Sequence, residues 1–254
     1  IYKNDKYFWE MNTGDIFIWI AMNWNKEKVP WIKLKEKGIY IIYYQTEPLG
    51  SGMSHPYEHV NEVWDYSCYN IMHFKKKKSR ITDNLKYRFV PPGYFCNECV
   101  QYKSKKDNKI VLFGSPKWRK SSWKIVTECF INENLENRLI SIYNVWDEEK
   151  YISFIQESFV SGIFINILKP GCGNILTSVR FSKLLSSKAI IISERCQEID
   201  EVKYQGIVDF VDLKNIVFKC KEYLKMTAEE RKTIANKRFQ LFKNRFSSKN
   251  IFYN

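Results

Sequence analysis

Short apolar segments of strand length recur along this chain and alternate with segments of helical pattern. Residues 15–22 (DIFIWIAM) and 38–45 (GIYIIYYQ) are continuous runs rich in isoleucine and aromatic residues, which is typical of strands buried on both faces of a parallel sheet. Similar runs follow at residues 109–113, 139–144 and 162–168. Parallel strands need crossover connections, and a helix between successive strands supplies them. The sequence therefore predicts an α/β fold with two Rossmann-like domains built on parallel sheets.

A polar, lysine-rich stretch at residues 101–108 (QYKSKKDN) interrupts the pattern before it restarts. We interpret it as a linker and expect a first domain at residues 1–104 and a second at residues 105–254. The chain of 254 residues is long enough for both to bury a core. The other expected helices cover residues 30–37, 57–66, 121–133, 147–157, 175–185, 213–225 and 228–245, and the other expected strands cover residues 69–74, 85–90, 189–193 and 207–211.

The chain is strongly basic, with a formal net charge of +13, so anionic ligands or nucleic acid are natural partners. The excess is spread evenly, with +6 on residues 1–106 and +7 on the remainder. A nucleic-acid-binding protein more often concentrates its charge on one face. A nucleotide diphosphate also suits a basic protein. Because no apolar run approaches membrane-spanning length, we expect no transmembrane segment.

The seven cysteines are scattered and odd in number, which indicates a reducing compartment, and we expect the cytoplasm. Cys96 and Cys99 form a lone CxxC pair, whereas a structural zinc site needs two further ligands. His55 and His59 are four residues apart, but Pro56 between them indicates a turn or a first helical turn. The sequence therefore predicts no metal site.

The loop after residues 109–113 has the composition of a phosphate-binding loop. Gly114 and Ser115 expose backbone amides, and Arg119 and Lys120 follow as cations. Amide N–H groups and a guanidinium can share the charge of a diphosphate. An ordinary connection with solvent-facing cations is the alternative.

Two further loops of the second domain are candidates, because ligands bind beyond the carboxyl ends of parallel strands. Gly171, Gly173 and Asn174 precede the expected helix that carries Arg180, so a ligand could approach the backbone at a helix end. Trp146 follows residues 139–144 and could present its ring to a nucleobase. A turn needing positive φ and a buried packing role are the respective alternatives.

In the first domain, Glu47 follows the strand expected at residues 38–45. A carboxylate there can act as a base or bind hydroxyl groups, and a structural role is the alternative. The chain has no GxSxG motif, which argues against a serine hydrolase.

Taken together, these segments resemble glycosyltransferases of the GT-B fold, in particular the family 1/4-like group. In the first domain YYQTEPL, NEVWDYSCYNI and FVPPGY carry the likeness. In the second, IVLFGSPKWRK, LISIYNVWDEEKYISFIQESFVSGIFINIL and VRFSKLLSSKAIIISE carry it, together with the closing helices. The likeness covers roughly residues 38–240 in the same order.

The resemblance implies transfer of a hexosyl or deoxyhexosyl group from a UDP- or GDP-linked sugar to a glycan acceptor, without metal, cofactor or nucleic acid. Glu47 would lie near the reacting centre. The donor-binding residues would be Gly114, Ser115, Arg119, Lys120, Asn144, Trp146, Asn166, Gly171, Gly173, Asn174 and Arg180. It also implies neighbouring domains of a longer polypeptide, as in multidomain glycosyltransferases of large DNA viruses, because the first domain is short and the chain opens without Met.

One departure from this pattern concerns the donor side. Relatives carry a glutamate three residues before Arg180, where this chain has Thr177, and Glu194, Glu198 or Asp200 could substitute for it. Two alternative functions stay open at this point. One is a non-catalytic glycan- or nucleotide-binding module, and the other is a basic nucleic-acid-binding domain.

Overall fold

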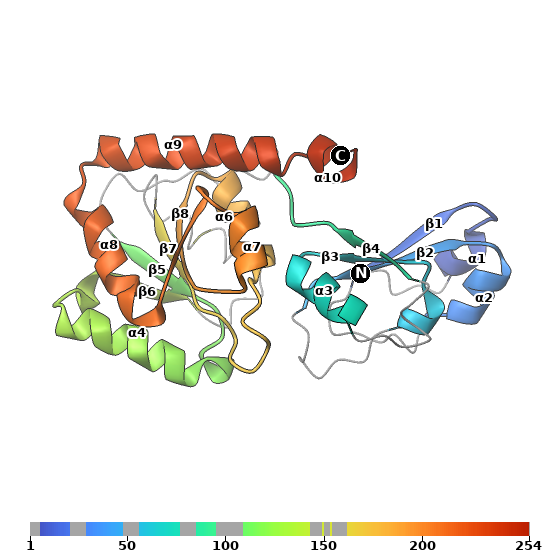
Figure 1. Ribbon diagram of the computed structural model, residues 1–254, viewed down its shortest axis with the longest axis horizontal. Helices are drawn as coiled ribbons and strands as arrows, with labels where there is room; N and C mark the ends of the chain where they lie inside the picture. Colours follow the sequence, from blue (N-terminus) through green and yellow to red (C-terminus); the bar gives the residue numbers. More distant parts are fainter. Residues whose placement is uncertain are drawn as a thin grey trace. The chain divides into compact units, whose positions relative to one another are not determined.

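The structure is a computed structural model that describes residues 6–20, 29–47, 56–76, 85–94, 109–142, 149, 153 and 162–253. It divides into two compact units, Ile1–Pro91 and Pro92–Asn254 (Figure 1). The linker and domain boundary predicted from the sequence, between residues 104 and 105, lie outside the described residues. Tyr94 belongs to the second unit because its N–H donates to the carbonyl oxygen of Phe246 at 2.9 Å.

The first unit is built on a parallel four-stranded sheet in the order β1-β2-β3-β4. Its strands are β1 (Ile16–Ile20), β2 (Tyr40–Gln45), β3 (Glu62–Asp65) and β4 (Lys86–Phe89). Its helices are α1 (Lys6–Glu10), α2 (Trp31–Glu36) and α3 (Cys68–Lys76), with a 3-10 turn at Tyr57–His59.

The core of this unit forms where β2 and β3 pack against α2. Ile41, Tyr43 and Val63 are buried together with Trp31 and Leu34. The helix predicted at residues 30–37 is confirmed as α2, and Gly38 follows it with φ +73°. This left-handed conformation is the usual way for glycine to end a helix.

Residues 57–76 correct the sequence prediction, which placed a helix at residues 57–66 and a strand at residues 69–74. The strand comes first, as β3, and α3 follows. Ser67 caps α3, because its Oγ accepts from the N–H of Asn70 at 3.2 Å. Asp65 ends β3, is fully buried and accepts from the N–H of Ser67 at 2.8 Å. The strand therefore ends at Asp65, and the helix begins directly after the cap at Ser67.

The second unit contains a parallel five-stranded sheet in the order β6-β5-β7-β8-β9. Strand β6, which follows β5 in the chain, lies on one side of β5, and β7 lies on the other side. The winding direction of the sheet therefore reverses beside β5. Open α/β sheets bind ligands at such a switch point, beyond the carboxyl ends of the strands. The strands are β5 (Ile110–Phe113), β6 (Leu139–Ile142), β7 (Ile163–Asn166), β8 (Ile190–Glu194) and β9 (Val208–Val211).

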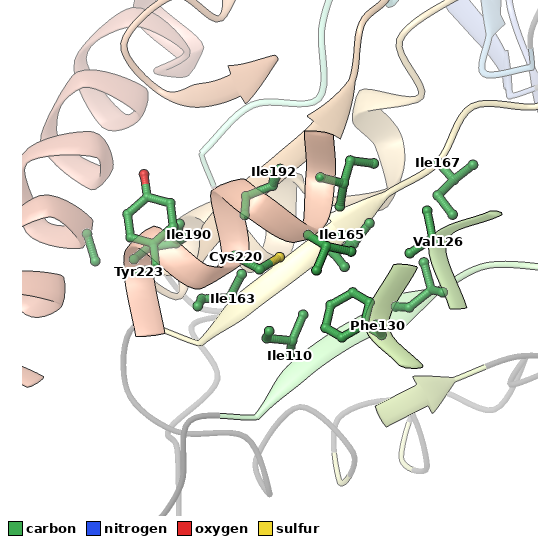
Figure 2. Close-up of a cluster of buried hydrophobic side chains, with 14 residues drawn as sticks. Ile110, Val126, Phe130, Ile163, Ile165, Ile167, Ile190, Ile192, Cys220 and Tyr223 are labelled. Carbon is green, nitrogen blue, oxygen red and sulfur yellow. The ribbon is translucent and has the colours of Figure 1, made fainter. Parts of the chain in front are cut away.

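Isoleucine side chains from the central strands form the main core of this unit (Figure 2). Ile165 and Ile192 are fully buried and pack with Phe130 and Cys220 from two of the helices. The helices are α4 (Lys120–Asn132), α6 (Ser182–Ser186), α7 (Glu198–Lys203), α8 (Ile216–Lys225), α9 (Ala228–Arg245) and α10 (Ser248–Phe252).

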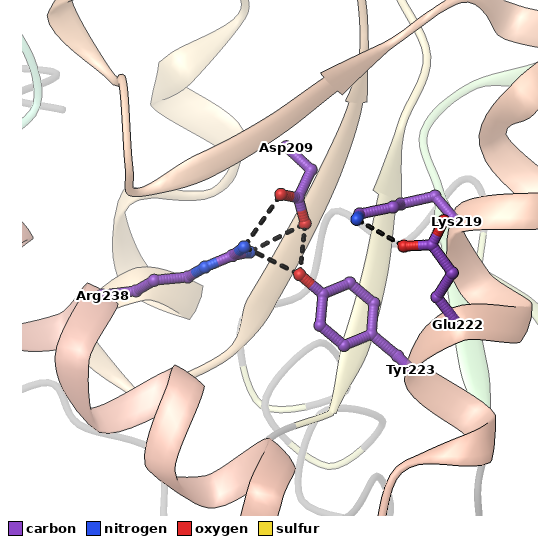
Figure 3. A network of polar contacts seen from close by, with 5 residues as sticks. All are labelled: Asp209, Lys219, Glu222, Tyr223 and Arg238. Atoms are coloured by element: carbon purple, nitrogen blue, oxygen red, sulfur yellow. Dashed lines mark hydrogen bonds and ion pairs between the residues drawn. The ribbon is translucent and has the colours of Figure 1, made fainter.

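The last strand and the closing helices are joined by a polar network (Figure 3). Arg238 of α9 donates from Nη1 and Nη2 to the carboxylate of Asp209 on β9, at 2.9 and 2.8 Å. The hydroxyl of Tyr223 on α8 donates to the same carboxylate at 2.5 Å. Strand β9 and the next two α-helices, α8 and α9, are thereby held at fixed positions.

The helix predicted at residues 228–245 is confirmed at both ends as α9, which begins with a capping box between Thr227 and Glu230. The helix predicted at residues 175–185 is wrong in extent. Only a 3-10 turn at Ser178–Arg180 and the short α6 form there. Serine and β-branched residues are weak helix formers, which explains the late start. The helix predicted at residues 147–157 falls almost entirely outside the described residues.

Within the part of the chain that the structure describes, no helix is both long enough and apolar enough to cross a membrane.

Candidate functional site

The candidate site lies at the carboxyl ends of β5, β7 and β8, beside the switch point of the second sheet. Two loops bound it: residues 114–119 follow β5, and residues 167–174 follow β7. The sequence predicted donor-binding residues in both loops.

Gly114 is the first residue after β5 and brings two arginines together. Its φ is +143°, a conformation that L side chains rarely adopt. A Cβ built on it would lie 3.5 Å from Nη1 of Arg180 and 3.8 Å from Nη1 of Arg119. The structure thus brings Gly114, Arg119 and Arg180 to one place, although 60 residues of chain separate the two arginines. Two guanidinium groups that converge on one glycine favour an anion there. The N–H of Gly114, which the sequence predicted as a phosphate donor, instead donates to the carbonyl oxygen of Ile142 at 3.1 Å.

The charged side chain of Arg119 is only 2% exposed, and backbone carbonyl groups hold it in place. Its Nε donates to the carbonyl oxygen of Ile167 at 2.9 Å, and its Nη1 donates to that of Ser115 at 3.4 Å. The side chain therefore ties the loop after β5 to the loop after β7 and keeps its guanidinium at the switch point.

Glu194, at the end of β8, holds the neighbouring peptide. Its Oε2 accepts from the N–H of Leu168 at 3.0 Å. Burial raises the pKa of this carboxyl, while the hydrogen bond from Leu168 and the charge of Arg119 act in the opposite direction. Arg119 and Glu194 thus bind successive backbone groups, at Ile167 and Leu168, and position the loop that follows.

Asn166 ends β7 and is fully buried. Its Nδ2 donates to Oγ of Ser193 at 2.9 Å, and its Oδ1 accepts from the hydroxyl of Thr177 at 3.3 Å. Thr177, which stands where the family resemblance implies a glutamate, therefore turns inward to the end of the sheet. Sequence reasoning did not identify Ser193, whose signal is a polar residue at the carboxyl end of the isoleucine run IIISE. Ligand binding by Asn166 stays a prediction.

The glycine loop after β7 is exposed at Gly171, Gly173 and Asn174, and all three have positive φ, between 52° and 76°. Gln197 fixes it from one side, since its Nε2 donates to the carbonyl oxygen of Gly173 at 2.6 Å. Residues 175–177, which follow, are irregular. The helix expected to begin at this loop does not form there, so the predicted stabilisation of an anion by a helix dipole at this loop is wrong.

Helix α4 begins directly after Arg119. It has 13 residues and begins at the exposed Lys120, and its N-cap residue Arg119 makes no side-chain capping hydrogen bond. Unpaired N–H groups of a first turn attract anions. Lys120 and this turn therefore add positive potential directly after Arg119.

The remaining predicted residues are placed as follows. Glu47 lies just after β2 in the first unit, where its carbonyl oxygen accepts from Nε2 of Gln45 at 2.9 Å. Asn144 and Trp146 lie outside the described residues. Of the other carboxylates considered, Glu198 is exposed and Asp200 is buried in the first turn of α7.

The described residues contain no group of three or more His, Cys, Asp or Glu side chains that could hold a metal ion. His59 stacks on Trp31, with ring centroids 5.9 Å apart. His55, Cys96 and Cys99 lie outside the described residues.

Solved glycosyltransferases share this fold. A glycosyltransferase from Rickettsia africae ESF-5 matches with a TM-score of 0.55 and 14% identity, over 93% of this chain and 74% of that chain. TarM matches with a TM-score of 0.57 and 10% identity, over 94% and 53%. An alpha,alpha-trehalose-phosphate synthase (UDP-forming) from Burkholderia vietnamiensis matches with a TM-score of 0.50 and 11% identity, over 84% and 65%.

These likenesses show the fold: the chain has the α/β architecture of GT-B glycosyltransferases, as the sequence predicted. It spans between 53% and 74% of the length of these structures. The sequence matches no protein-family profile, and no curated protein is significantly similar to it.

Proposed function

We propose that this chain is a glycosyltransferase that moves a sugar from a nucleoside-diphosphate donor to a hydroxyl group of a glycan. The observation that carries the proposal is the convergence of Arg119 and Arg180 on Gly114, at the switch point of a GT-B unit. A diphosphate has the charge and the oxygen acceptors that this arrangement can bind. The UDP-forming enzyme among the structural neighbours supports UDP ahead of GDP as the carrier.

The fixed positive groups would act on the leaving group. As the bond from the anomeric carbon to the phosphate oxygen breaks, negative charge builds up on the departing nucleoside diphosphate. Arg119, Arg180, Lys120 and the first turn of α4 are preorganised to stabilise that charge. Because these groups supply the charge that a divalent ion could otherwise supply, we propose that transfer proceeds without metal.

Glu47 is the proposed acid–base group. An acceptor hydroxyl would attack the anomeric carbon, and in an inverting reaction its proton would pass to the Glu47 carboxylate. In a retaining reaction, Glu47 would position the acceptor and the leaving phosphate would take the proton. The expected product pair in both cases is a glycosylated acceptor and a nucleoside diphosphate.

Release of UDP or GDP from a panel of nucleotide sugars, measured in EDTA, tests this proposal. We expect the wild-type chain to release one of the two, and Arg180→Gln to lower the rate at least about tenfold, the effect of about 1.4 kcal/mol. Arg195→Gln is the matched control, because Arg195 is an exposed arginine paired with Glu201 at 3.0 Å. A chain that binds UDP or GDP but releases neither from any of the nucleotide sugars would contradict transfer and favour a non-catalytic binding module.

A further inference from the structure

Trp118 is a large aromatic side chain left 57% exposed at the end of the loop after β5. It ends a 3-10 turn at Pro116–Trp118, and proline at the start restricts the backbone of this turn. Isolated exposed aromatic residues are common on protein surfaces and need no function. Trp118 is different because of what surrounds its ring.

Two ammonium groups lie over the indole of Trp118. The Nζ of Lys117 is 5.2 Å from the ring centroid, and that of Lys169 is 5.1 Å away. Lys169 comes from the other loop of the candidate site, directly after Leu168. The contact between Trp118 and Lys169 therefore joins the loops after β5 and β7 at the switch point, directly before Arg119 in the chain.

We propose that Trp118, Lys117 and Lys169 form a subsite for a sugar ring that carries its own phosphate or carboxylate group. An aromatic face packs well against the C–H face of a sugar ring, and the two ammonium groups can pair with the anion. Exposed cation–π contacts are weak, so an anionic ligand can exchange them for ion pairs without a large loss. The inference deepens the proposed function, on which it rests, because it names acidic sugars as the acceptor class.

The position of the ring assigns this subsite to the acceptor rather than to the donor. Arg119 is 2% exposed, whereas the neighbouring Trp118 is 57% exposed. We place the donor diphosphate at the buried Arg119 and the half-buried Arg180, and the indole is more exposed than either arginine. An acidic acceptor bound to Trp118 would therefore leave the diphosphate site open.

Calorimetric titration of the whole chain tests the subsite. The ligands are mannose 6-phosphate and glucuronate, with glucose and inorganic phosphate as single-feature controls, each without and with saturating UDP. We expect one or both acidic sugars to bind more tightly than either control, and to bind equally well with UDP present. Trp118→Ala should weaken this binding at least about tenfold, a change of 1.4 kcal/mol. Lys169→Gln should weaken binding of the acidic sugars while leaving that of glucose unchanged.

Phe218→Ala is the matched control, because Phe218 is 54% exposed on α8 and far in sequence from both loops. It should leave sugar binding unchanged. Three results would each overturn the subsite. They are failure of both acidic sugars to bind, equal binding of the acidic sugars by Trp118→Ala and the wild type, and competition between the acidic sugars and UDP. UDP binding by Trp118→Ala is measured separately. If the variant and the wild type both bind UDP while the sugars fail, the subsite is wrong and the donor site stands.

Discussion

Replacing Arg119 with lysine separates its two roles, because lysine keeps the charge but has a single nitrogen. In the wild-type protein Nε binds the carbonyl oxygen of Ile167 at 2.9 Å, while Nη1 lies near Gly114. A lysine ammonium can occupy one of these positions only. We therefore expect Arg119→Lys to lose either the anchor of the loop after β7 or the charge at the diphosphate site.

The size of the effect follows from the burial of this hydrogen bond. A hydrogen bond to a charged donor contributes about 1.5–3 kcal/mol. For a protein of this size, 1 kcal/mol shifts the melting temperature by about 2–4 °C, so we expect a decrease of roughly 3–12 °C. If the ammonium instead keeps the anchor, stability is retained and affinity for UDP or GDP falls at least about tenfold, which is 1.4 kcal/mol.

Differential scanning fluorimetry, without and with UDP and GDP, measures both quantities on one sample. Lys124→Ala is the control, because the ion pair of Lys124 with Glu128 is exposed and such pairs contribute about 0–1 kcal/mol. A variant Arg119→Lys with wild-type stability and a wild-type response to the ligand would refute the reasoning for both roles.

Three further predictions concern single contacts. Gly114→Ala should lower the unfolding free energy by about 1–3 kcal/mol in urea titrations, because φ at Gly114 is +143°; an unchanged midpoint would show that the backbone relaxes. Arg238→Met should lower the unfolding free energy by about 3 kcal/mol in the same assay, because it leaves Asp209 without its bidentate partner. A loss under about 1 kcal/mol would place the pair among ordinary surface ion pairs. Burial raises the pKa of Glu194 in the folded state, so its ionisation destabilises the fold as pH rises through that pKa. Glu194→Gln should therefore gain stability relative to wild type between pH 4 and pH 7, and a constant difference across that range would contradict this account.

The sequence correctly predicted those helices and strands whose capping residues and hydrophobic pattern lie within the element or directly beside it. Helix α9 has its capping box at Thr227 and Glu230, and it was predicted at the correct residues. Strand β3 has only four residues, and its identity depends on pairing with β2 and β4. The neighbouring helix begins where Ser67 and Asp65 cap it, a contact that periodicity does not report. This is why residues 57–76 were predicted in the wrong order.

The candidate site was predictable as a set of loops but not as a set of contacts. Gly114, Arg119 and Arg180 were named from their positions after expected strands, and the structure brings them together. The burial of Arg119 and its hydrogen bond to Ile167 depend on two residues that lie 48 positions apart in the sequence. The pairing of Asn166 with Ser193 likewise joins two strands. A single sequence can point to polar residues at strand ends such as Ser193, but the pairing of such residues arises from tertiary packing and is not visible in it.

The central claim is that the switch point of the second unit binds a nucleoside diphosphate through Arg119 and Arg180. Titration of the wild-type chain and of Arg180→Gln with UDP and GDP, in EDTA and at constant ionic strength, tests it most directly. A ligand at a hundred times its Kd should stabilise the wild-type fold by about 2.7 kcal/mol, and Arg180→Gln should lose most of that gain at the same concentration. Absence of stabilisation of the wild type by either ligand, or equal stabilisation of the variant, would contradict the account.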